Sequence, residues 1–211
     1  MLADGGGVTL AVNDNWDGST TVSATGARVG AFALADQSSR DAALVATLGS
    51  GQFTARISGT AGASGVALAE VYDATVAAGT GAGLRLINMS VRAVAGSGAE
   101  VLIAGFVVAD GPRRVLIRAV GPGLTAFGVG GVLTDPQLDL YRDQTRIDGN
   151  GDWAGNPLVT QAGQRVGAFA LAPGSKDAAM VVLLSPGAYS AQAKGANGAE
   201  GVALVEVYEI R

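Results

Sequence analysis

Side-chain oxygens gather beside each of the two tryptophans of this chain. In each group they alternate along the sequence, as the first ligands of a calcium-binding loop do, and Gly18 closes the first group. The six residues are Asn13, Asn15 and Asp17 in the first group and Asp148, Asn150 and Asp152 in the second. Calcium is therefore the one cofactor that the sequence suggests.

The same residues also fit an Asx-rich hairpin turn, in which side chains bond the local backbone. When the two tryptophans are aligned, Asn13 lies opposite Asn150, but Ala11 lies opposite Asp148. The ligand pattern is thus out of register between the two groups, and the bidentate glutamate expected further on is missing. The sequence favours the turn over the calcium site.

Trp16 and Trp153 are the only tryptophans, and they occupy equivalent places in the two groups. An exposed indole ring beside Asn and Asp side chains would stack on a sugar, which makes a polysaccharide a candidate ligand. A tryptophan that closes one end of a β-sandwich core is the commoner arrangement, and the sequence favours it.

Catalytic chemistry has little to use in this chain, because histidine and cysteine are both absent. Without them there is no Ser-His-Asp triad, no thiolate nucleophile and no ordinary zinc site. Glu70 and Glu206 suggest the paired carboxylates of a glycosidase. They are, however, one position of a repeated motif, and nothing in the sequence brings them together. We therefore expect no enzymatic activity.

Arginines form the only basic cluster, at positions 113, 114 and 118. We expect Arg113, Arg114 and Arg118 to pair within the molecule, with Asp135 and Asp139 as their partners, instead of binding an anion. The formal net charge of −4 gives no basic patch for nucleic acid. No apolar run approaches the roughly 18 residues of a membrane-spanning helix.

Two motifs occur twice. Residues 28–35 and 165–172 are identical over eight positions, and residues 65–72 and 201–208 differ at one of eight. The offset is 137 residues in the first pair (28 to 165) and 136 in the second (65 to 201). This long period predicts an internal duplication of about 137 residues with one deletion.

Short stretches with strand periodicity or glycine boundaries follow one another along the chain. They are residues 8–12, 42–48, 52–58, 66–72, 84–93, 101–108, 114–120 and 138–141. No segment shows a capped helical period, so we expect no helix. Together with 33 glycines, the pattern predicts an all-β fold of tandem antiparallel β-sandwich modules, jelly-roll-like in type.

Alternation within 114–120 predicts two differently occupied faces of one strand. Arg114, Leu116 and Arg118 should lie on one face, and Val115, Ile117 and Ala119 on the other.

The repeats divide the chain into three parts, which we call the first copy, the middle block and the second copy. They cover residues 1–73, about 84–137 and about 138–211, with a glycine-rich linker at 74–83. The predicted domains are a half-repeat β module at 1–78 and a complete β-sandwich module at 79–211. Since one middle block can complete only one copy, the other must form a small sheet alone or leave strand edges open.

Residues 85–93, 101–108, 114–123, 135–141 and 205–208 together resemble a repeat of large secreted or cell-surface proteins of Verrucomicrobia-type bacteria. The second copy is also loosely similar to bacterial pre-peptidase C-terminal domains, through Leu138-Asp-Leu-Tyr141 and Pro186-Gly-Ala-Tyr189. The first resemblance implies an extracellular repeat, and the second implies a β-sandwich accessory domain. Neither brings an active site to this sequence.

We therefore expect a non-catalytic, extracellular or cell-surface structural or adhesive protein. Its unmatched copy predicts self-association into a homo-oligomer or a head-to-tail filament by β-strand complementation. The alternative is a carbohydrate-binding accessory module of a secreted enzyme, with Trp16 and Trp153 as the ligand-binding residues.

Overall fold

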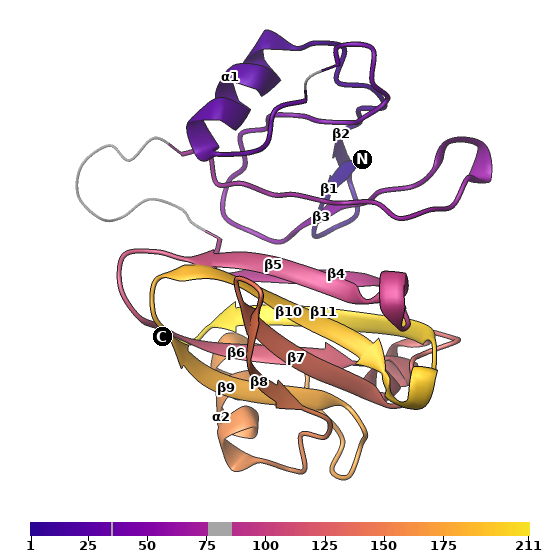
Figure 1. Cartoon of the computed structure of the whole chain (residues 1–211), viewed down its shortest axis with the longest axis vertical. Helices are drawn as coiled ribbons and strands as arrows, with labels where there is room; N and C mark the ends of the chain where they lie inside the picture. The colour runs from indigo at the N-terminus through magenta and orange to yellow at the C-terminus, as the bar shows by residue number, and fades with distance from the viewer. Residues whose placement is uncertain (35, 76–85) are drawn as a thin grey trace. The chain divides into compact units, whose positions relative to one another are not determined.

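The computed structural model describes residues 1–34, 36–75 and 86–211. The chain divides into a first unit, Met1–Leu86, and a second unit, Ile87–Arg211. The predicted boundary between residues 78 and 79 lies outside the described residues, and so does the predicted linker from residue 76 onward. Three antiparallel sheets dominate the described part, which confirms the all-β class (Figure 1).

The second unit is a sandwich of two four-stranded antiparallel sheets. Its strands are β4 (Asn88–Ala95), β5 (Leu102–Val108), β6 (Arg113–Val120), β7 (Pro136–Arg142), β8 (Thr145–Asn150), β9 (Ala178–Leu184), β10 (Gly187–Gly195) and β11 (Gly201–Glu209). The strand orders are β5-β10-β7-β8 and β4-β11-β6-β9. In both sheets a late strand lies beside an early one, as in a jelly roll, so the middle block and the second copy interleave.

β6 shows why this sandwich forms. Val115, Ile117 and Ala119 point into the core between the two sheets, whereas Leu116 and Val120 belong to a second apolar cluster on the outer face. The predicted alternation of this strand is thus confirmed. The outer cluster is covered by a helix and its flanking loops, so β6 is buried on both faces and forms the centre of the unit.

Two short helices were not predicted: α1 (Thr20–Val29) in the first unit and α2 (Pro157–Val166) in the second. Ser19 and Asn156 cap them by accepting hydrogen bonds from the backbone of the first turn, and Gly30 and Gly167 end them in the left-handed conformation. The expectation of no helix was therefore wrong. In Figure 1, α2 lies beside β9, against which it packs.

The described residues also form four 3-10 turns. They are η1 (Thr60–Gly62), η2 (Gly98–Glu100), η3 (Pro122–Phe127) and η4 (Ala196–Gly198). η3 follows β6 directly and carries the Gly-Pro-Gly sequence into a tight turn.

The first unit contains one three-stranded sheet in the order β2-β1-β3, made of β1 (Leu2–Asp4), β2 (Thr9–Ala11) and β3 (Phe53–Ala55). The order matches β8-β7-β10 of the second unit. The strands predicted at 42–48 and 66–72 are not formed, which corrects that expectation.

The reason is the absence of sheet neighbours. The counterparts of 42–48 and 66–72 are β9 and β11, whose strand neighbours are β6 and β4 of the middle block. A strand is stable only when its backbone groups are paired, whatever its side-chain pattern.

Candidate functional site

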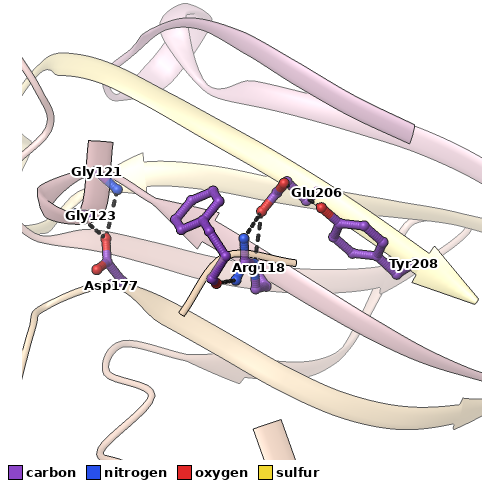
Figure 2. A network of polar contacts seen from close by, with 7 residues as sticks. Arg118, Gly121, Gly123, Asp177, Glu206 and Tyr208 are labelled. Carbon is purple, nitrogen blue, oxygen red and sulfur yellow. Dashed lines mark hydrogen bonds and ion pairs between the residues drawn. The ribbon is translucent and has the colours of Figure 1, made fainter. Parts of the chain in front are cut away.

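The most densely bonded polar group of the second unit is a buried ion pair between β6 and β11. The strand register places Arg118 directly opposite Glu206. Arg118 Nε donates to Glu206 Oε2 at 2.8 Å, and Nη2 donates to the same oxygen. The hydroxyl of Tyr208 donates to Oε1 at 2.6 Å, so both carboxylate oxygens are occupied (Figure 2).

Arg118 is also held from the side of α2. Its guanidinium lies 4.3 Å from the centre of the Phe169 ring, and Nη1 donates to the Phe169 carbonyl at 2.5 Å. A cation over an aromatic face in a dry site is a favourable contact. Burial, together with the neighbouring Glu206 carboxylate, raises the pKa of Tyr208, so this hydroxyl keeps its proton and remains a donor.

A second anchor binds the turn after β6. Asp177 is fully buried, and its Oδ1 accepts from the backbone N–H of Gly121 at 2.9 Å and of Gly123 at 3.1 Å. Ser175 Oγ donates to the other oxygen at 2.7 Å. Figure 2 shows this carboxylate reaching the glycine turn next to the Arg118 group. Asp177 therefore accepts hydrogen bonds from the two N–H groups that the turn leaves without backbone partners.

A third anchor is a close backbone approach. A Cβ on Gly201 would lie 2.5 Å from the backbone nitrogen of Leu133, closer than real contacts allow. Leu133 N donates to the Val202 carbonyl at 2.9 Å, and Val202 N donates to the Gly131 carbonyl at 2.8 Å. Glycine is needed here because the two backbones nearly touch.

We call these three anchors the strand joint. It connects the middle block, through Arg118, Gly121, Gly123 and Leu133, to the second copy, through Phe169, Asp177, Gly201, Glu206 and Tyr208. Each of its charged groups is satisfied by another group of the joint. Such an arrangement holds strands together and offers no free acid, base or nucleophile.

The first copy has the same residue type at each matching position of the joint. The matching residues are Phe32, Asp41, Gly65, Glu70 and Tyr72. Here Glu70 accepts only the Tyr72 hydroxyl, at 3.0 Å, within the described part of the chain. A Cβ on Gly65 would meet nothing within 4 Å. We call Phe169, Asp177, Gly201, Glu206 and Tyr208 the acceptor side of the joint, and Arg118, Gly121, Gly123 and Leu133 its donor side. Among the described residues, the acceptor side is thus present twice and the donor side once.

The tryptophans are buried. Trp16 and Trp153 are each 6% exposed. Trp16 Nε1 donates to the Asp36 carbonyl at 3.0 Å, and Trp153 Nε1 donates to Ser175 Oγ at 3.1 Å. Neither ring presents an open face on which a sugar would stack.

Asn13 and Asn150, which hold matching positions in the predicted calcium groups, make the same kind of hydrogen bond in both units. Asn13 Oδ1 accepts from the backbone of Ala43, and Asn150 Oδ1 accepts from Ala179, both at 2.9 Å. Asn13 also donates to the Asn15 carbonyl at 2.8 Å. These are side-chain-to-backbone bonds of the kind that an Asx-rich turn makes.

The aspartates of those groups lie in other settings. Asp17 sits in the turn before α1 with φ of 51°, Asp148 accepts from the Gly149 backbone, and Asp152 pairs with Lys176 at 2.9 Å. Among the described residues, no group of three or more acidic, histidine or cysteine side chains is placed to hold a metal ion. The calcium site stays a prediction that this geometry does not support.

Two of the three clustered arginines pair within the molecule, but with partners other than those expected, and Arg114 is exposed. Arg118 binds Glu206, and Arg113 lies 3.6 Å from Glu209. Asp139 instead binds Arg146 at 2.7 Å and Lys194 at 2.8 Å. The sequence did contain a sign of the true partner of Arg118, because Glu206 is a conspicuous acid of the repeated motif.

No family model and no curated protein matches the chain. One solved structure, the pre-peptidase C-terminal domain of collagenase from Bacillus anthracis, is loosely similar, with a TM-score of 0.35 and 13% sequence identity. The match covers 57% of this chain and 89% of that one. A likeness this loose assigns no function. Among the described helices, none is long and apolar enough to cross a membrane.

Proposed function

We propose that this chain is a non-catalytic structural or adhesive module of an extracellular or cell-surface protein, and that its first unit accepts β-strands from another polypeptide. The supporting observation is the state of residues 66–72. In the described part of the chain they form no strand, and Val71 is 68% exposed, whereas the matching Val207 in β11 is 6% exposed.

An unpaired apolar segment of this kind recruits other strands. Val66 and Leu68, which alternate with Val71 along an extended segment, are also highly exposed, so both faces of the segment lack cover. Added strands would bury these side chains and pair the free backbone groups at once. The extracellular placement rests on the sequence resemblances given above.

Head-to-tail self-assembly into homo-oligomers or filaments is one form of this function. It requires a second molecule to present an edge strand to the first unit. The edge strands of the two sheets in the second unit are β4, β5, β8 and β9. A contact between two different surfaces repeats from molecule to molecule, and it closes as a ring or continues as a fibre.

Light scattering and electron microscopy over a concentration series test this function. Self-assembly predicts a mass that grows with concentration and a Val71→Lys variant that does not grow. Leu158→Lys, at an exposed leucine of α2, is the matched control and should behave as the parent does. A strict monomer defeats the self-assembly form. Slow amide exchange at 66–72 in that monomer defeats the acceptor function itself.

A further inference from the structure

We infer that the partner of the first unit is a segment of another polypeptide with the chemistry of residues 112–134, namely a strand with a central arginine followed by a Gly-Pro-Gly turn. This inference rests on the proposed function and names its partner. It is carried by the strand joint, whose acceptor side is repeated in the first copy without a donor.

Glu70 offers a charge that an arginine would complement. In the second unit Tyr208 occupies one oxygen of Glu206, and the Arg118 guanidinium occupies the other. In the first unit the Tyr72 hydroxyl occupies Oε1 of Glu70, and Oε2 accepts no hydrogen bond from a described residue. An arginine placed as Arg118 is would complete this carboxylate.

Phe32 supports the same ligand. Its counterpart Phe169 offers Arg118 both a ring face and a carbonyl oxygen. Phe32 follows α1 as Phe169 follows α2, and its side chain is 60% exposed. A large aromatic side chain left this open is costly in water, and a docked guanidinium would cover it.

The carboxylate of Asp41 has only one of its two oxygens occupied by a described residue. Ser39 Oγ donates to its Oδ2 at 2.8 Å, as Ser175 Oγ does to Asp177. In the second unit the other oxygen receives two backbone N–H groups from a Gly-X-Gly turn. No described residue donates to that oxygen of Asp41. The first unit therefore has an acceptor for the N–H groups of such a turn, but no described residue supplies the turn.

Gly65 is a glycine where the described first unit does not need one. Its counterpart Gly201 must be glycine, because the backbone of Leu133 passes within contact distance. Gly65 has open space around it and a backbone conformation that other residues adopt, so nothing in the described first unit requires glycine there. A donor backbone that approaches Gly65 as closely as Leu133 approaches Gly201 would make glycine necessary at this position.

The donor segment of a second molecule of this chain is an unfavourable occupant of the first unit. Among the described residues there are two acceptor sides and one donor side, and that donor is docked in its own second unit. Moving that donor into another molecule's first unit would open the second unit that it left, with no net gain in paired strands. The inferred partner therefore carries a donor segment that is not already docked.

A synthetic peptide of residues 112–134, labelled with a fluorophore, tests the inference against the full chain. We expect saturable one-to-one binding and slower amide exchange at residues 42–48 and 66–72. Gly65→Ala in the chain should weaken binding at least tenfold, and Glu70→Gln about tenfold, as loss of a charged hydrogen bond does. Gly65→Ala meets no neighbouring atom, so its first unit should fold normally, which Trp16 fluorescence checks.

The peptide itself supplies the matched control. Arg118→Ala in the peptide should weaken binding about tenfold, and Arg114→Ala, which removes the same charge from an exposed position, should not. Binding that is unchanged by both Gly65→Ala and the Arg118→Ala peptide overturns the inference, and so does no binding at all. The acceptor function survives that second result only if residues 66–72 become protected when chains associate with one another.

Discussion

Arg118 donates two hydrogen bonds to one carboxylate oxygen of Glu206, although 88 residues separate the two along the chain. Both residues are almost fully buried, at 2% and 4% exposed. The pair joins the middle block to the second copy at the centre of one sheet. It explains why the motif that contains Glu206 is a strand there and not in the first copy.

The first prediction concerns this pair. Arg118→Met should lower the free energy of unfolding of the second unit by about 3–5 kcal/mol, because Glu206 is left buried without its counter-charge. Denaturant unfolding followed by Trp153 fluorescence, in a Trp16→Phe background, measures it. Arg114→Met is the control, and its effect should stay within about 0.5 kcal/mol because Arg114 is exposed. Equal losses of unfolding free energy in the two variants would show that the Arg118–Glu206 pair does not stabilise the second unit more than an exposed arginine does.

The second prediction compares two matched acids. Asp177→Ala should destabilise the second unit by about 3 kcal/mol, because Gly121 N–H and Gly123 N–H lose their acceptor. Asp41→Ala should change the stability of the first unit by less than about 0.5 kcal/mol in the chain alone. Trp153 and Trp16 report the two units separately. A large loss at Asp41 would mean that it is already engaged as Asp177 is.

The third prediction uses the matched glycines. Gly201→Ala forces a side chain against the Leu133 backbone and should cost the second unit about 2–3 kcal/mol or more. Gly65→Ala has no such neighbour, and it should leave the first unit unchanged or stabilise it by a few tenths of a kcal/mol. Thermal unfolding of both variants decides the matter. If Gly65→Ala proves as harmful as Gly201→Ala, the first unit is already closed.

The fourth prediction concerns acid. Burial acts to raise the pKa of Asp139, but hydrogen bonds and charges from Lys194 and Arg146 outweigh it and hold the pKa below its usual value. A carboxyl with a lowered pKa stabilises the fold above its unfolded-state pKa, and that stabilisation is lost as the pH falls through the folded-state value. The stability difference between the parent and Asp139→Asn should therefore shrink as the pH drops below about 4. A difference that does not change between pH 5 and pH 2 would contradict this.

Much of the sandwich was predictable from the sequence, because local patterns suffice where a partner strand exists. The strands expected at 101–108, 114–120 and 138–141 are present, and so is the alternation around Arg118. The same reasoning failed at 42–48 and 66–72. A strand pattern states only what a segment does when its neighbours are supplied.

The helices were missed although their ends carried signals. Asn156 followed by Pro157 is a typical helix start, and Gly30 and Gly167 are typical ends. Their ten-residue length left too little apolar periodicity to outweigh the surrounding strand pattern.

The joint was only half visible in the sequence. Glu70 and Glu206 stood out as a matched pair, and Arg118 as part of a basic cluster. Their connection depends on the register between β6 and β11, which no local pattern encodes. For the same reason, the roles of Asp41 and Gly65 emerge only when both units are compared.

Hydrogen–deuterium exchange of the full chain at low concentration tests the central claim most directly. The amides of residues 202–208 should exchange about a thousandfold or more slowly than unstructured ones, because β11 lies between two strands. The amides of residues 66–72, with nearly the same sequence, should exchange at close to unstructured rates. Similar, strong protection of both segments in a monomeric chain would show that the first unit has no missing strands.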